Sequence, residues 1–590
     1  MIDNKGENHI GALHDEDYKE KYFTPLINHN SLIYDISRAK ESLNGKWNFQ
    51  IDQYDTFLRA NWYSNEEKDQ NGLEMPLDHN FDHWEEINVP ACWNTESKEY
   101  FYYEGPAIYH KSFKYSNYGE DKVFLKIGAA NYDSYIFLNK KFLGHHQGGS
   151  TPFMLEITDY LSQENTLQIA VDNTRRREAV PTKNTDWFNY GGIYRDVELL
   201  RLPETYIKDF SLALAENSYQ QLVLNLTAAG ENLTDKVKLE IPELEIELNI
   251  PLANGKAEAV FAAKPELWSP DNPKLYQVII SYRNDRIEDQ IGFRQVKVEG
   301  RDIYLNGNKI FLKGIAAHEE SLNNGKAVTE TEIIENIKLA KEMNCNYIRL
   351  AHYPHSYKVA QIADQLGVML WEEIPVYWAI YFENQFTYND AENQLLELIK
   401  RDINRASVII WSVGNENEDT DARLKFMSGL ANTARKVDPT RLVSAACLVD
   451  EKNNRISDRL TEYLDIIGQN EYYGWYIPDI SKLIDCMENS KPDKPVVITE
   501  FGAGALSGER GTKDDLFTED YQLKVYQKQT EVLGKIEYIK GLSPWILFDF
   551  RCPRRTNKYQ QGYNRKGLLS ADKKHKKLAF FEMQRFYSEI

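Results

Sequence analysis

Apolar and polar residues alternate in short runs over the first half of the chain, which is typical of sheets with one buried face. From about Asn30 to Pro203, runs such as VFLKIGA (from Val123) and YIFLNKKFLG (from Tyr135) are separated by turn residues. These runs are numerous enough for a two-sheet sandwich. The segment 204–300 repeats the pattern on a smaller scale, in LVLNLTAAG, KVKLEI, AEAVFAA and LYQVIISYR. Its length and strand number predict an immunoglobulin-like sandwich.

After Asp302 the pattern changes, and short apolar strands alternate with segments of helical period. KIFLKGIAAH precedes TETEIIENIKLAKEM, NYIRLAHYP precedes SYKVAQIADQLG, VMLWEEIPVYW precedes NDAENQLLELIKRDINRA, and SVIIWSVGNE precedes DTDARLKFMSGLANTARKV. The other predicted strands are RLVSAACL, DIIGQNEYYG, VVITEFG and GLSPWILFDF. Eight strands with helices between most of them predict a closed (β/α)8 barrel. The predicted domains are therefore a β-sandwich in 1–203, an immunoglobulin-like sandwich in 204–300 and the barrel in 301–590.

Two glutamates stand at the ends of predicted barrel strands. Glu416 follows Asn415 after the apolar run from Ser407, and Glu500 ends the run from Pro495. The carboxyl ends of barrel strands are where this fold keeps its chemistry, and two carboxyl groups there suit hydrolysis of a glycosidic bond. Either glutamate alone is often only a helix cap or an ion-pair partner. Polar residues crowded behind a strand of Val and Ile favour the catalytic interpretation.

Composition narrows the possible classes of protein. The chain has 590 residues, 42% of them hydrophobic and 27% charged, which is typical of a soluble multidomain protein. No apolar run approaches the roughly 20 residues of a membrane span, so no membrane association is expected. The net charge of -20 disfavours nucleic-acid binding, since such binding draws on neutralising phosphates. It would also repel an anionic substrate unless Lys and Arg reverse the field locally.

Cysteine and histidine spacing indicates neither a disulfide framework nor a metal site. The five cysteines are scattered and odd in number, and we expect them to be reduced and mostly buried. The pair His145-His146 is predicted to lie in a surface turn of the sandwich. We expect no metal and no cofactor. The polar first residues contain no secretory signal, so we expect a cytoplasmic protein, or a periplasmic or secreted one if a leader was removed.

Several motifs, in order along the chain, resemble glycoside hydrolase family 2, which contains β-galactosidases, β-glucuronidases and β-mannosidases. They are YEGPAIYHKSF, NYDSYIFLNKKFLGHHQGGSTPF, NTDWFNYGGIYRDVEL and GFRQVKVEGRDIYLNGNKIFLKGIAAHEE. The resemblance covers nearly the whole chain and implies a sugar-binding-like jelly-roll for the first sandwich. It also implies that Glu416 is the general acid/base and Glu500 the nucleophile of a retaining mechanism. The acid then needs a raised pKa, for which Trp411, Tyr473 and Trp545 are expected to form an apolar wall.

Other strand ends supply candidate substrate-binding residues. Asn415 is suited to the sugar 2-hydroxyl, Arg349 to holding the nucleophile ionised, and His352 to a sugar hydroxyl. The last two could also be a packed arginine and a core histidine. Polar and aromatic groups expected at the same face are Glu373, Trp378, Asn470, Tyr472, Tyr473 and Tyr476, although a Tyr-rich strand end is often only core and rim. The resemblance places the loop of Asp186 at the pocket mouth.

The choice of sugar depends on the segment RCPRRTNKYQQGYNRKGLL, which begins at Arg551. Its cations are Arg551, Arg554, Arg555, Lys558, Arg565 and Lys566, the local patch that an acidic sugar requires. Asn564 and Lys566 resemble the element by which β-glucuronidases bind the C6 carboxylate. Some relatives labelled as galactosidases also carry Asn-x-Lys-Gly, where the lysine can be structural.

We therefore expect a retaining exo-β-glycosidase acting on terminal β-D-glucuronides, either small conjugates or oligosaccharides. One alternative is a β-galactosidase that uses the same two glutamates. Another is a non-catalytic carbohydrate-binding protein that keeps the barrel as a scaffold. The expected partner is the carbohydrate substrate, and the family resemblance makes a homo-oligomer possible.

Overall fold

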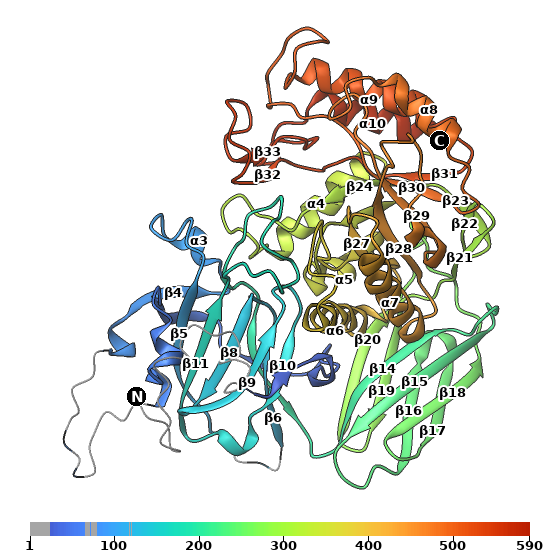
Figure 1. The fold of residues 1–590 in the computed structure, drawn as a ribbon. Coiled ribbons are helices and arrows are strands. Elements are labelled where there is room, and N and C mark those ends of the chain that lie inside the picture. The colour runs from blue at the N-terminus through green and yellow to red at the C-terminus, as the bar shows by residue number, and fades with distance from the viewer. Residues whose placement is uncertain (1–23, 65–70, 72, 74–78, 117–118, 120) are drawn as a thin grey trace.

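The structure is a computed structural model that describes residues 24–64, 71, 73, 79–116, 119 and 121–590. The polar N-terminal segment, in which no secretory signal is expected, lies outside these residues. Two β-sandwiches precede a barrel that fills the C-terminal half of the chain (Figure 1). This is the predicted fold class, and it is confirmed. No helix in the described ranges is long and apolar enough to cross a membrane.

The first sandwich packs a seven-stranded sheet against a four-stranded one, with Trp47, Phe49 and Tyr109 buried between them. The larger sheet has the order β1 (Leu26–Ile27), β9 (Lys141–Gln147), β8 (Asp133–Leu138), β11 (Glu164–Asp172), β5 (Pro106–Lys114), β3 (Gly45–Ile51), β4 (Glu85–Val89). The smaller has the order β10 (Phe153–Glu156), β6 (Lys122–Ile127), β13 (Val197–Leu202), β2 (Lys40–Ser42). Short elements complete the domain: β7 (Ala130–Asn131), β12 (Gly192–Ile193), α2 (Thr56–Arg59) and α3 (Trp93–Glu96).

The prediction that His145-His146 forms a surface turn is wrong. Both histidines are buried in β9, and His146 Nε2 lies 3.1 Å from Glu397 Oε1 in the barrel domain. The turn of this hairpin is at Asn139 and Lys140, whose positive φ angles of 51° and 66° are typical of a tight hairpin connection. The strand that follows the turn is therefore longer than the sequence pattern indicated.

The second sandwich packs a three-stranded sheet against a four-stranded one around an aliphatic core. The three-stranded sheet has the order β14 (Tyr206–Leu214), β15 (Gln221–Ala229), β18 (Lys256–Ala262). The four-stranded sheet has the order β17 (Ile246–Leu252), β16 (Asp235–Ile241), β19 (Tyr276–Tyr282), β20 (Asp285–Ile291). A small sheet of β21 (Val296–Glu299), β22 (Asp302–Leu305) and β23 (Asn308–Ile310) leads into the barrel.

Eight parallel strands close the barrel in chain order, and most of their residues are buried because helices cover their outer surface. They are β24 (Leu312–Ala317), β25 (Tyr347–Leu350), β26 (Met369–Glu373), β27 (Val408–Asn415), β28 (Leu442–Leu448), β29 (Ile467–Asn470), β30 (Val496–Glu500) and β31 (Ile539–Leu542). The helices are α4 (Glu330–Glu342), α5 (Tyr357–Leu366), α6 (Gln385–Asp402), α7 (Asp421–Val437), α8 (Ser481–Asn489), α9 (Glu519–Leu533) and α10 (Leu578–Glu589). Three of these helices, α4, α7 and α9, begin with a threonine cap. The side chains of Thr329, Thr420 and Thr518 accept hydrogen bonds from backbone N–H groups in the first turn, which fixes where each helix begins.

The eighth strand differs from its prediction. It was expected in GLSPWILFDF, but β31 ends at Leu542, two residues into that run. Pro544 has no N–H with which to extend the ladder. The rest of the run crosses the barrel mouth, and Phe550–Arg551 (β32) pairs there with Tyr563–Asn564 (β33).

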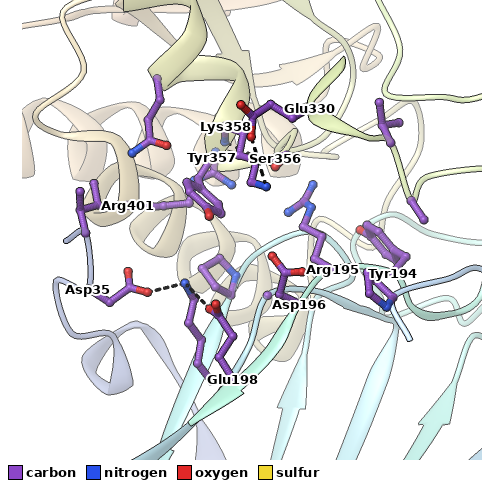
Figure 2. A pocket seen from close by; sticks show the side chains of 18 of the residues that line it. Asp35, Tyr194, Arg195, Asp196, Glu198, Glu330, Ser356, Tyr357, Lys358 and Arg401 are labelled. Atoms are coloured by element: carbon purple, nitrogen blue, oxygen red, sulfur yellow. Dashed lines mark hydrogen bonds and ion pairs between the residues drawn. The ribbon is translucent and has the colours of Figure 1, made fainter. Parts of the chain in front are cut away.

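A cavity of about 550 Å³ lies at the interface between the first sandwich and the barrel (Figure 2). Lys126 on β6 forms ion pairs there with Asp35 at 2.5 Å and Glu198 at 3.5 Å. Arg195 pairs with Glu319 at 2.7 Å. Neither Glu416 nor Glu500 lines this cavity, so its size alone does not make it the candidate catalytic site.

Candidate active site

Glu416 and Glu500 face one cavity of about 210 Å³ at the carboxyl end of the barrel. Glu416 is the first residue after β27, and Glu500 is the last residue of β30. Glu416 has a φ of 52°, in the left-handed region that residues with side chains rarely adopt. Its backbone N–H donates to Ala446 O of the neighbouring strand at 2.8 Å. Backbone strain of this kind is often found at functional sites.

Glu416 has the environment of a carboxylic acid that keeps its proton near neutral pH. Burial and the neighbouring Glu500 carboxylate raise its pKa to about 7. Two donors act in the opposite direction, since Trp378 Nε1 lies 2.7 Å from Oε2 and Asn470 Nδ2 lies 3.0 Å from Oε1. The carboxyl group is therefore fixed in orientation and suited to giving up and taking back one proton.

Glu500 is held by donors on both oxygens. Arg349 Nη1 donates to Oε1 at 2.8 Å, and the Tyr472 hydroxyl donates to Oε2 at 2.7 Å. His352 Nε2 lies 3.8 Å from Oε1. These contacts orient the carboxylate at the cavity wall, as a positioned nucleophile requires.

Arg349 joins the two glutamates through a buried network. Its Nη2 donates to Asn415 Oδ1 at 2.8 Å, and Asn470 Nδ2 donates both to that oxygen, at 3.1 Å, and to Glu416. Asn415 Nδ2 is buried and has no hydrogen-bond partner among the described residues. Asn415 itself does not line the cavity, and its contact to a sugar hydroxyl stays a prediction.

Glu373 balances the charge of Arg349. Its Oε1 accepts from Arg349 Nη2 and faces His352 Nδ1, both at 2.9 Å, and Ser412 donates to its Oε2 at 2.8 Å. Burial alone would raise the pKa of Glu373, but the Arg349 guanidinium and these hydrogen bonds lower it to about 2. Arg349 and His352 are therefore packed in the core, as the structural alternative expected; His352 also lines the cavity, and Arg349 reaches it only through its hydrogen bond to Glu500.

The side of the cavity at Tyr472 and Tyr476 is cationic. Lys566 is 3% exposed, its Nζ donates to the Tyr476 hydroxyl at 2.8 Å, and it lies over the rings of Tyr472 and Tyr476 at 4.8 and 4.6 Å. Arg555 Nη1 donates to the same hydroxyl at 3.2 Å. Although burial would raise the pKa of Tyr476, the two cations lower it. Within the described part of the chain, Lys566 forms no ion pair with a carboxylate.

Asp186 from the first sandwich reaches this cationic side. Its Oδ2 accepts from Arg555 Nη2 at 2.5 Å and from Asn564 Nδ2 at 3.1 Å, while Asn564 Oδ1 accepts from the Lys566 N–H at 3.1 Å. Burial would raise the pKa of Asp186, but the Arg555 guanidinium lowers it. The backbone N–H of Phe188 donates to Arg551 O at 3.1 Å, which fixes the sandwich loop against the barrel mouth.

The structure brings most of the predicted site residues together, and the exceptions have clear causes. Trp545 lines the cavity and stacks on His352, with ring centroids 4.9 Å apart. Tyr473 also lines it, but its hydroxyl donates to Asn454 at 2.5 Å. Trp411 does not, because it points out of β27 toward Asp438, to which its indole N–H donates at 2.9 Å. It therefore forms no part of the apolar wall.

The cationic segment is also divided. Arg555 and Lys566 line the cavity, whereas Arg565 pairs with Asp549 at 3.3 Å and Arg551 Nη2 donates to Leu322 O at 2.6 Å. Lys558 lies over the ring of Tyr559 at 4.7 Å. Only part of the patch that the sequence indicated can therefore act on a substrate.

Sequence reasoning did not single out several residues that line the cavity. They lie at the end of β28 or in the loops after β26, β28 and β29, and they are Tyr377, Leu448, Val449, Glu451, Glu471 and Ile477. Their position just beyond a barrel strand was the one available signal. Trp378 and Tyr472 were expected only to lie at this face, yet they make direct hydrogen bonds to Glu416 and Glu500.

Comparison with known proteins matches three domain models of one family to successive parts of the chain. The models described as the sugar binding domain, the family itself and the TIM barrel domain of glycosyl hydrolases family 2 match residues 40–203, 205–294 and 296–590. A β-glucuronidase of Bacteroides fragilis is 27% identical over 84% of this chain and 77% of its own length. One from Streptococcus agalactiae is 25% identical over 94% of this chain and 96% of its own. The solved β-D-glucuronidase of Dictyoglomus thermophilum has a TM-score of 0.79 and 27% identity, covering 94% of this chain and 97% of that one.

Proposed function

This chain belongs to glycoside hydrolase family 2, and we propose that it hydrolyses terminal β-D-glucuronides with retention of configuration. One observation carries the choice of sugar: the Lys566 ammonium is buried beside the cavity and forms no ion pair with a carboxylate of the described residues. A buried cation without an anionic partner is costly, and the C6 carboxylate of a uronic acid would supply that partner. The β-glucuronidases among the relatives support the same choice.

The mechanism follows from the two glutamates. Glu500 would attack the anomeric carbon as a carboxylate while Glu416 gives its proton to the glycosidic oxygen, so that the leaving group departs as a neutral alcohol or phenol. This step leaves a glycosyl ester on Glu500 and a carboxylate on Glu416. Glu416 would then take a proton from water, the resulting hydroxide would attack the same carbon, and Glu500 would be released. Asn415 is suited to binding a sugar hydroxyl through its free Nδ2.

Paired assays with p-nitrophenyl β-D-glucuronide and p-nitrophenyl β-D-galactoside test the proposal. We expect the glucuronide to be hydrolysed with the higher kcat/KM. Lys566→Ala should lower that value by about 10²- to 10³-fold, because it removes a buried charge partner, and should leave the galactoside rate nearly unchanged. Faster turnover of the galactoside, unaffected by Lys566→Ala, would identify a β-galactosidase instead. Absence of turnover on every glycoside would favour a carbohydrate-binding protein.

A further inference from the structure

We propose that the side of the cavity next to Glu416 is a binding site for an apolar aromatic leaving group, formed by Leu448, Val449 and Ile477. The inference rests on the proposed function and extends it to the other half of the substrate. It selects aryl glucuronides over glucuronides linked to a second acidic sugar.

The position of the proton donor decides where the leaving group lies. Glu416 must reach the glycosidic oxygen, so the departing group emerges beside its carboxyl. Asn470, which donates to Glu416 Oε1, is the register partner of Leu448 on the neighbouring strand β28. Leu448 and Val449 therefore extend the cavity wall from the proton donor outward. Ile477 lies on the adjoining loop, where it bridges to Tyr473.

The chemistry of this wall differs from the rest of the site. Leu448 is 42% exposed although it is a large apolar residue at the end of a barrel strand. Val449 and Ile477 are partly buried and add further apolar surface. None of these three side chains can form a hydrogen bond, so they offer nothing to the hydroxyl groups of a second sugar. They can exclude water from the face of an aromatic ring.

Charge adds to the selection. The cations that line the cavity, Arg555 and Lys566, are on the side of Tyr476, whereas the exposed residue next to Val449 on the lining is the acidic Glu451. Arg455 on the same turn pairs with Asp450 and does not line the cavity. Arg554 lies over Trp378 and donates to Asn184 Oδ1 at 3.0 Å. A leaving group with a carboxylate would therefore meet Glu451 on the cavity wall of this side, whereas the Lys and Arg side chains that line the cavity, among the described residues, are those near Tyr476.

Inhibition by thioglycosides that the enzyme does not cleave tests the binding site without the influence of leaving-group reactivity. The probes are phenyl and methyl 1-thio-β-D-glucuronide, measured as inhibitors of the full-length wild type and of Leu448→Ser. We expect Leu448→Ser to raise the inhibition constant of the phenyl compound about tenfold and that of the methyl compound less than twofold. The separate variant Leu448→Met should keep the wild-type inhibition constants, because it keeps the apolar surface.

Leu516→Ser is the matched control, since Leu516 is a 53% exposed leucine that does not line the cavity, and it should change neither constant. Equal effects of Leu448→Ser on both compounds, or no effect on either, would overturn the inference. Failure of both thioglucuronides to inhibit the wild type would instead count against the proposed function itself.

Discussion

The interface cavity and the barrel cavity differ in the pairing of one buried lysine in each, Lys126 and Lys566. In the larger, between the first sandwich and the barrel, the Lys126 ammonium contacts Asp35 and Glu198 and the Arg195 guanidinium contacts Glu319. In the smaller, the Lys566 ammonium contacts two aromatic rings and a hydroxyl and forms no ion pair with a carboxylate, within the part of the chain that the structure describes. Paired charges hold two domains together, whereas a buried charge without a counter-ion is suited to a charged ligand. Within the described residues, the lysine without a carboxylate partner distinguishes the barrel cavity, where Arg555 is itself paired with Asp186.

The largest effect is expected when a glutamate is replaced by glutamine in the barrel cavity rather than in the interface cavity. Glu500→Gln should lower kcat on p-nitrophenyl β-D-glucuronide by at least about 10⁴-fold, because the amide cannot act as the nucleophile. Glu198→Gln in the interface cavity should leave kcat within about twofold of the wild type. Steady-state kinetics on both variants measure the difference. Turnover that survives Glu500→Gln would show that another residue is the nucleophile.

The pH dependence of kcat/KM tests the environment of Glu416. Its raised pKa of about 7 means that the acid is protonated below that pH, so kcat/KM should fall about tenfold per pH unit above it. Trp378→Phe removes a hydrogen bond that favours the carboxylate. The pKa should then rise, and the alkaline limb should move to higher pH by about half to one unit.

Trp475→Phe is the control for that shift, because Trp475 packs on Phe517 and does not contact Glu416. Trp475→Phe should leave the alkaline limb of the kcat/KM profile at the wild-type pH. A limb that moves to lower pH in Trp378→Phe would mean that the indole does not stabilise the carboxylate form of Glu416.

The smallest effect on activity is expected from Lys126→Met, which should instead lower stability. Burial would raise the pKa of Asp35, but Lys126 and Lys40 lower it to about 2. Since this folded-state pKa is depressed, the pair stabilises the protein above the ordinary pKa of aspartate and loses its effect as pH falls toward 2. We expect a loss of about 2 kcal/mol in the free energy of unfolding at pH 7, and kcat close to that of the wild type.

Denaturant unfolding of Lys126→Met at pH 7 and at progressively lower pH measures this effect. The difference from the wild type should shrink as Asp35 becomes protonated. A variant as stable as the wild type at pH 7 would show that the interface ion pairs contribute little to holding the domains together.

The sequence by itself determined the fold class and the positions of the two glutamates along the barrel strands. Apolar strands that alternate with helical periods bury their surface as a parallel sheet covered by helices, and eight such strands suit a closed barrel. β27 and β30 end where the pattern predicted. Local patterns were less reliable where tertiary contacts act. The pattern at His145-His146 was read as a turn because it did not reveal that barrel helix α6 buries this strand end.

Only the tertiary structure decided which side chains meet. Asp186 and Arg555 are far apart in the sequence, and their contact depends on a sandwich loop reaching the barrel mouth. Trp411 lies within β27 and points toward Asp438, whereas Trp378, in the loop after β26, donates to Glu416. The direction of a side chain at a strand end depends on the last residues of the strand and on the packing of the loop. Periodicity along the chain does not contain that information.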